Sequence, residues 1–141
     1  MTDDPAIISL FGTMATDWRV AAKARLIEMG YEPTDNTDER WPTAETAEQI
    51  LPLLRQDHEI MLDCDLILWH HDSGTPGNTA RFELPMPLFL QRQTIVHVEP
   101  GVVSREYMHA LCNLYPQCFH WAETLEDAYR MIPDILASRQ R

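Results

Sequence analysis

The feature that most limits how this chain can fold is a series of short apolar runs separated by segments with helical spacing. The two clearest runs lie in Ala6–Phe11 and Asp65–Trp69. Continuous apolar runs of this length are typical of strands buried on both faces, as in parallel sheets. Strand and helix alternate five times along the chain. The sequence therefore predicts an α/β fold in which a parallel five-stranded sheet has helices on both faces.

The expected elements follow from the same periodicity together with capping and turn residues. An N-cap at Thr16 and a stop at Gly30 bound the first helix, and Pro52 should interrupt or kink the second. Pro85 and Pro87 should perturb the third helix. We expect strands at Ala6–Phe11, Tyr31–Thr34, Asp65–Trp69, Thr94–Val98 and Cys118–Trp121, and later helices from about Ala44 and over Thr79–Arg92, Ser104–Leu114 and Leu125–Ala137.

The composition limits which kinds of molecule this protein can bind. The 141 residues are enough for one domain, 1–141, and include 22 acidic against 11 basic residues, for a net charge of −11. With Lys23 as the only lysine, the chain is a poor candidate for binding a nucleic-acid polymer, which requires clustered cations. A small ligand needs only one local pocket and remains compatible with this charge.

The sequence also gives expectations about membranes, location and cofactors. No apolar stretch approaches the ~18 residues of a membrane span, and the first residues, MTDDP, are acidic where a signal peptide would be basic. We therefore expect a cytoplasmic protein without a membrane partner. The three cysteines, Cys64, Cys112 and Cys118, are odd in number and form no Cys-x-x-Cys pair. We expect neither a disulfide framework nor a zinc knuckle, and no cofactor.

Ligands of open parallel sheets bind beyond the carboxyl ends of the strands, where the strand order reverses. The loops that begin at Gly12 and His70 would both open there if the first and third strands are neighbours. Asp72, at the end of the third strand, can accept hydrogen bonds from ribose hydroxyls. It can equally cap a turn before Ser73-Gly74-Thr75.

Glu83 is the one acid that opens an otherwise apolar segment, in RFELPM. An acid near a helix N-terminus is stabilised by the helix dipole, by ~0.3–1 kcal/mol, and needs no other reason to be there. A carboxylate at the mouth of the sheet can also attack an anomeric carbon and form a covalent glycosyl intermediate.

Other polar or aromatic groups have two interpretations each. The loop from Ser73 to Thr79 is a connector or a cradle for a phosphate, without the lysine of the Walker type. Trp41 packs in the core or stacks on a base, whereas Trp18 belongs to an apolar stripe. His70 and His71 suggest a metal, but consecutive strand residues point to opposite faces, so both could bind one ion only if the strand has already ended. No further histidine or acid at metal-ligand spacing completes a site, so we expect no metal. The loop's candidate ligands are Ser73, Gly74, Thr75, Asn78 and Thr79.

Three segments resemble the nucleoside 2-deoxyribosyltransferase-like family. They are IISLFGT followed by DWR, then TDNTDERW, and CDLILWHHDSGTPGNTARFEL. The resemblance covers about the first two-thirds of the chain. It implies a flavodoxin-like or Rossmann-like three-layer sandwich with a five-stranded parallel sheet, in agreement with the alternation of elements.

The resemblance also implies roles for individual residues. Glu83 takes the place of the family's nucleophile, Asp72 that of the aspartate that binds the sugar hydroxyls, and Gly12 that of the glycine that lines the base pocket, with Thr13 beside it. Family members build their sites with residues of a neighbouring subunit, so we expect a homodimer or larger homo-oligomer. Apolar residues of segment 86–90 would form the interface or the core.

Three hypotheses about function follow. The first is cleavage of an N-glycosidic bond, or 2-deoxyribosyl transfer, on a small nucleoside or nucleotide through Glu83. The second is a catalytically inactive nucleoside- or nucleotide-binding module of the same fold. It is favoured by Leu84-Pro85 in place of the family's glycine after the nucleophile, and by Leu10-Phe11 where the family often has a tyrosine. The third is a structural partner protein without a small-molecule ligand.

Overall fold

The computed structural model describes residues 4–13, 17–73, 87 and 90–139. Five parallel strands form one sheet in the order β2-β1-β3-β4-β5. The strand order reverses between β1 and β3, which are neighbours as the loop argument required. The strands are β1 (Ile7–Gly12), β2 (Glu32–Asp35), β3 (Leu66–His71), β4 (Thr94–Val98) and β5 (Phe119–Trp121).

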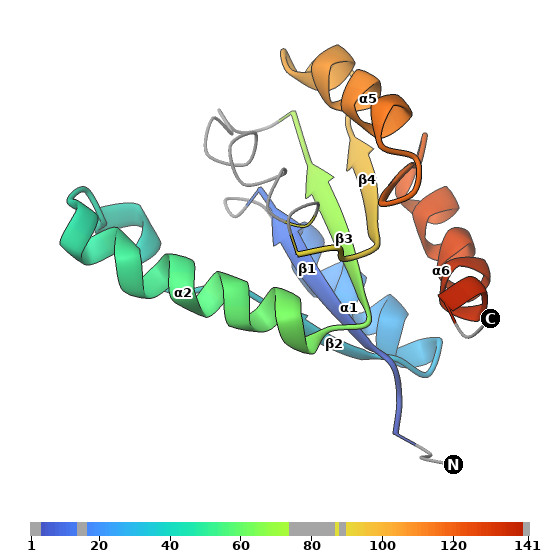
Figure 1. Cartoon of the computed structure of the whole chain (residues 1–141), viewed down its shortest axis with the longest axis horizontal. Helices are drawn as coiled ribbons and strands as arrows, with labels where there is room; N and C mark the ends of the chain where they lie inside the picture. The colour runs from blue at the N-terminus through green and yellow to red at the C-terminus, as the bar shows by residue number, and fades with distance from the viewer. Residues whose placement is uncertain (1–3, 14–16, 74–86, 88–89, 140–141) are drawn as a thin grey trace.

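Helices cover both faces of this sheet. Side chains of α1 and α6 pack with one set of strand residues, and side chains of α2 and α5 pack with the other. In Figure 1, α1 passes behind the strands and α2 in front of them. The three-layer α/β sandwich predicted from the sequence is confirmed. The helices are α1 (Trp18–Glu28), α2 (Ala47–Asp63), α5 (Arg105–Leu114) and α6 (Leu125–Arg139), with a short 3-10 helix, η1, at Trp41–Thr43.

The central strand β3 shows why its sequence is apolar without alternation. Leu66 and Leu68 belong to the core beneath α1 and α6, and Ile67 and Trp69 to the core beneath α2 and α5. Successive side chains of a strand point to opposite faces, and here both faces are covered. All six residues of β3 are therefore buried.

The second helix begins later than predicted and continues through Pro52. Thr46 ends the preceding loop in a capping box: its hydroxyl accepts a hydrogen bond from Gln49 N at 3.2 Å, and Gln49 Oε1 accepts one from Thr46 N at 3.1 Å. The expected start at about Ala44 is therefore wrong. So is an interruption at Pro52, because α2 runs unbroken from Ala47 to Asp63. One missing hydrogen bond is offset by the burial of Leu53 and Met61.

Among the other boundaries, the ends of β3 and of the third expected helix differ from expectation for a reason that the structure shows. β3 extends through His71 instead of ending at Trp69, because His71 continues the parallel pairing with β4 opposite Val98. The helix expected over Thr79–Arg92 does not reach Arg92: Leu90 and Gln91 form a turn, with Gln91 at a φ of 55°. Most of that expected helix, and the expected cap Thr16, lie outside the described residues. No helix in the described ranges is long and apolar enough to cross a membrane.

Gly12, at the end of β1, lies close against the backbone of His70 in β3. Its φ is +116°, and a Cβ added there would lie 1.9 Å from the carbonyl oxygen of His70. Gly30, which ends the turn after α1 with a φ of +91°, has open space where a Cβ would be. The two glycines share an unusual backbone conformation but only Gly12 lacks room for a side chain.

We predict that Gly12→Ala lowers the free energy of unfolding by roughly 3 kcal/mol or more, because strain and a backbone clash add. Gly30→Ala is the matched control. It should lower the free energy of unfolding by only about 1–2 kcal/mol, the contribution of the unfavourable backbone conformation without a clash. Urea denaturation of both variants measures the difference. Equal losses would show that the contact between β1 and β3 adjusts freely.

Candidate active site

The polar residues of three strands meet at one edge of the sheet. The parallel register places Gly12 of β1 opposite His70 of β3, and His70 opposite His97 of β4. Asp72 follows His70 by two residues, and Glu99 follows His97 by two. This edge is formed by the carboxyl ends of the strands, beside the point where the strand order reverses.

Thr13 holds the loops after β1 and β3 together. Its backbone N donates to His70 O at 2.9 Å, and its hydroxyl accepts from the backbone N of Asp72 at 3.2 Å. Trp18 Nε1 donates to Thr13 O at 2.6 Å. Thr13 and Asp72 are both buried. The structure therefore brings together three residues that the sequence singled out for the site: Gly12, Thr13 and Asp72.

His70 of β3 and His97 of β4 form a buried pair of imidazole rings. Their Nδ1 atoms lie 2.8 Å apart, so one ring donates and the other accepts. Burial, followed by the charge of the other ring, lowers the pKa of His70 to about 4. Burial also lowers the pKa of His97. Both rings are therefore neutral at pH 7.

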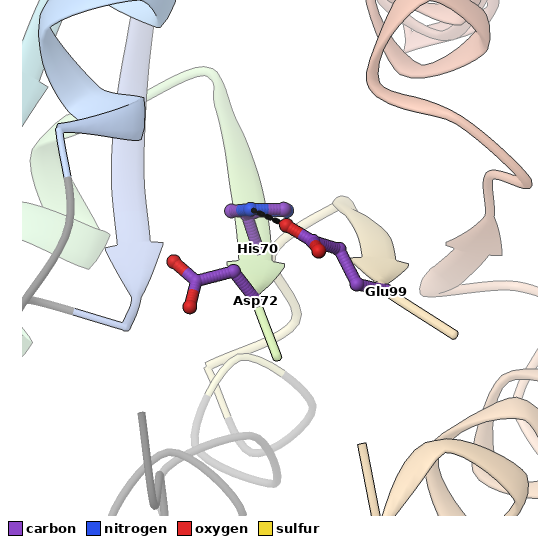
Figure 2. A group of neighbouring side chains, drawn as sticks. All are labelled: His70, Asp72 and Glu99. Carbon is purple, nitrogen blue, oxygen red and sulfur yellow. Dashed lines mark ion pairs between the residues drawn. The ribbon is translucent and has the colours of Figure 1, made fainter. Parts of the chain in front are cut away.

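Glu99 is the acid on the outer side of His70. Its Oε1 lies 3.7 Å from His70 Nε2, and its Oε2 accepts a hydrogen bond from the hydroxyl of Ser73 at 3.2 Å. Figure 2 shows Asp72 and Glu99 on either side of the His70 ring. One ligand atom from each of the three lies within 4.8 Å of the other two. A group of one imidazole and two carboxylates has the chemistry to hold a cation.

His71 takes no part in this group. β3 continues through His71, so its ring points to the opposite face from that of His70. Its Nδ1 is buried and has no hydrogen-bond partner among the described residues. The two adjacent histidines thus cannot share one ion, as argued from their spacing.

Arg19, in α1, binds the backbone at the carboxyl end of β1. Its guanidinium donates to the carbonyl oxygens of Leu10 and Gly12, each at 3.1 Å, and to Asn36 Oδ1 at 2.8 Å. Asn36 Nδ2 in turn donates to Asp57 Oδ2 at 3.3 Å. A cation, an amide and an acid from α1, the loop after β2 and α2 are therefore joined at the edge of the site.

In this network, the Asp57 carboxyl has a pKa far from its ordinary value. It is buried, and its Oδ1 has no hydrogen-bond partner among the described residues. Burial raises its pKa to about 7, against the opposing effects of Asn36 and Arg19. Near neutral pH this carboxyl is therefore partly protonated.

The remaining predicted site residues divide into two groups. Trp41 lies in η1, before α2, and within the described part of the chain no hydrogen bond or ring contact joins it to Gly12, Thr13 or Asp72. Its indole N–H is buried without a partner among those residues. Ser73 is exposed and next to Glu99. The others, Gly74, Thr75, Asn78, Thr79 and Glu83, lie outside the described residues.

The sequence argument missed His97 and Glu99. A signal was present, because both follow the apolar start of a strand whose bounds, Thr94–Val98, were predicted correctly. The carboxyl ends of neighbouring parallel strands lie at the same edge, so these residues had to approach His70 and Asp72. Arg19, Asn36 and Asp57 carried no comparable signal, because they come from three separate elements.

The fold is shared with an enzyme of nucleoside chemistry. A 2-deoxyribosyltransferase from Bacillus psychrosaccharolyticus superposes with a TM-score of 0.63 at 15% sequence identity, over 87% of this chain and 90% of that one. A CMP N-glycosidase from Clostridium botulinum gives a TM-score of 0.46 at 16% identity, over 90% and 98%. No protein-family model and no curated protein matches the sequence. The flavodoxin-like fold implied by the sequence resemblance is confirmed.

We predict that Asp57 makes the protein less stable as the pH rises. Its pKa is about 7 in the folded state and near 3.8 as a free side chain, so the folded state binds its proton more tightly. The resulting stabilisation is fully present below about pH 4 and is lost as the pH rises through 7. Asp57→Asn removes this contribution.

The free energy of unfolding, measured by urea denaturation between acidic and mildly alkaline pH, tests this. The advantage of wild type over Asp57→Asn should shrink by a few kcal/mol, since one pKa unit corresponds to about 1.4 kcal/mol. Asp63→Asn, at an exposed position of the same helix, is the control. Parallel pH curves for wild type and Asp57→Asn would contradict the assignment.

Proposed function

We propose that this protein cleaves or transfers the N-glycosidic bond of a small nucleoside or nucleotide. The observation that best supports the proposal is the position of Asp72. This buried acid lies at the carboxyl end of the central strand, where its backbone N donates to the hydroxyl of Thr13 and where sheets of this type bind their ligands. The shared fold with a 2-deoxyribosyltransferase points to the same chemistry.

In the proposed reaction, the Asp72 carboxylate accepts hydrogen bonds from the sugar hydroxyls. Glu83 attacks C1′, an oxygen–carbon bond forms, and the C1′–N bond breaks with its electron pair passing to the base, which takes up a proton. Water or a second base then displaces Glu83 and regenerates the carboxylate. The role of Glu83 rests on the family resemblance of its sequence segment.

Other residues are assigned to binding. Gly12 and Thr13 face the base, and Trp41 stacks on it. The loop from Ser73 to Thr79, with Gly74, Thr75 and Asn78, holds a 5′-phosphate if the substrate is a nucleotide. Hydrolysis and transfer differ only in the acceptor and use the same residues.

A second candidate function is a binding module that keeps the fold without turnover. Leu10 and Phe11 are completely buried in the core, so this end of β1 supplies no hydroxyl at the position where the family often has a tyrosine. Incubation with nucleosides separates the two functions. An enzyme releases free base, whereas a binding module shows saturable binding without product.

Paired variants test the two acids. We predict that Glu83→Ala abolishes base release and leaves the fold intact, because an acid early in a helix, the position that the sequence predicts for Glu83, contributes only ~0.3–1 kcal/mol. Glu106→Ala, an exposed acid in the first turn of α5, is the control and should keep full activity. Unchanged turnover of Glu83→Ala would remove it as the nucleophile.

Asp72→Asn should weaken substrate binding and slow turnover while leaving measurable activity. Loss of a charged hydrogen-bond acceptor typically costs ~1.5–3 kcal/mol, or roughly ten- to a hundredfold. The loss should appear in kcat as well as in KM, because these bonds strengthen in the oxocarbenium-like transition state. Wild-type values of both constants would show that Asp72 only caps its loop.

As part of the same proposal, the protein is a homodimer or larger homo-oligomer whose subunits complete each other's sites. Light scattering at micromolar concentration should give a mass of at least two chains. A monomer that still turns over substrate would contradict this assembly.

A further inference from the structure

We propose that His70, Asp72 and Glu99 bind a divalent transition-metal ion at the carboxyl ends of β3 and β4. One ligand atom from each residue lies within 4.8 Å of the other two. The residues come from two neighbouring strands, and Figure 2 shows the His70 ring between the two acids. This inference does not depend on the proposed glycosidic reaction.

The hydrogen bonds of the histidine pair determine which nitrogen of His70 is available. The Nδ1 atoms of His70 and His97 lie 2.8 Å apart, and a neutral imidazole carries one N–H, so one ring donates to the other. A metal ion on the outer side of His70 selects the arrangement in which His70 Nδ1 donates to His97 Nδ1. His70 Nε2 is left with its lone pair, directed away from His97.

That lone pair faces a carboxylate. Glu99 Oε1 lies 3.7 Å from His70 Nε2, longer than a hydrogen bond. Two acceptors at this separation do not attract each other, but a cation between them binds both. Neutral imidazole with carboxylate oxygens is a ligand set for zinc, cobalt or manganese.

The surroundings of the three residues resemble the outer shell of a metal site. A metal-bound histidine usually donates its second N–H to a fixed acceptor, here His97, and bound carboxylates are themselves hydrogen-bonded. Ser73 donates to Glu99 Oε2 at 3.2 Å, and Thr13 fixes the backbone of Asp72. Metal–ligand bonds of about 2.0–2.2 Å require the ligand atoms to approach further. Rotation of the Glu99 side chain, 38% exposed, can provide much of this.

Direct ion binding tests the site. The full chain is titrated at neutral pH with zinc, cobalt or manganese chloride in a calorimeter, and the cobalt complex is followed by visible absorption. We expect one tight ion per chain, with affinity reduced about tenfold or more in Glu99→Gln and in Asp72→Asn. Glu126→Gln is the control, because its acid lies on α6 and binds Arg25 instead.

A second pair of variants tests the histidine relay. His97→Phe removes the acceptor for His70 Nδ1 and should lower ion affinity about 10–100-fold. His97→Asn offers an amide oxygen in its place and should recover part of the loss. Circular dichroism verifies that each variant is folded. If His97→Phe does not fold, Glu99→Gln decides the test, because Glu99 is partly exposed and its substitution should leave the fold intact.

Two results would overturn the site: no saturable binding of any of the three ions, or equal affinity in wild type, Glu99→Gln and Asp72→Asn. Base release is measured separately on the same samples. Absence of base release with ion binding intact contradicts only the proposed function, and the reverse result contradicts only the metal site.

Discussion

The contact between the ends of β1 and β3 is the constraint on which the site depends. Gly12 lies so close to the His70 carbonyl that no side chain fits between them, and Thr13 then bonds to both His70 and Asp72. These bonds hold the first residues after β3, Asp72 and its backbone N, against the end of β1. The close backbone contact at Gly12 and the hydroxyl of Thr13 together set where the central acid is held.

Buried polar groups surround this contact, and each avoids an isolated charge in a different way. His70 and His97 remain neutral and bond to each other. Arg19 keeps its charge, and carbonyl oxygens and Asn36 accept its hydrogen bonds. Asp57 holds its proton up to about pH 7. Burying an unpaired ion would cost several kcal/mol, so pairing or neutrality is required wherever the edge of the sheet excludes water.

The proposed nucleoside site and the proposed ion site share Asp72, and the same architecture explains both. Parallel strands bring the residues that follow each strand to one edge, with carboxylates on neighbouring strands and neutral rings beneath them. Such an edge attracts groups that can donate hydrogen bonds or carry positive charge. Sugar hydroxyls satisfy the first requirement and a divalent cation the second.

Much of the fold could be predicted because local patterns specify it. The predicted strands agree with the observed ones to within two residues, and β4 was bounded correctly at Thr94–Val98. Errors arose where local rules competed. The capping box at Thr46 overrode the apolar spacing that suggested a start at Ala44, and burial of one side of α2 overrode the helix-breaking tendency of Pro52.

The sequence by itself predicted the layered parallel sheet and placed Gly12, Thr13 and Asp72 at or just after the ends of strands. These follow from periodicity and from strand ends, which are local properties. Only the tertiary structure decided that His97 and Glu99 lie beside His70 and that Arg19 and Asn36 reach Asp57. Those pairings join residues far apart in the chain, and they depend on register and burial, which no local pattern encodes.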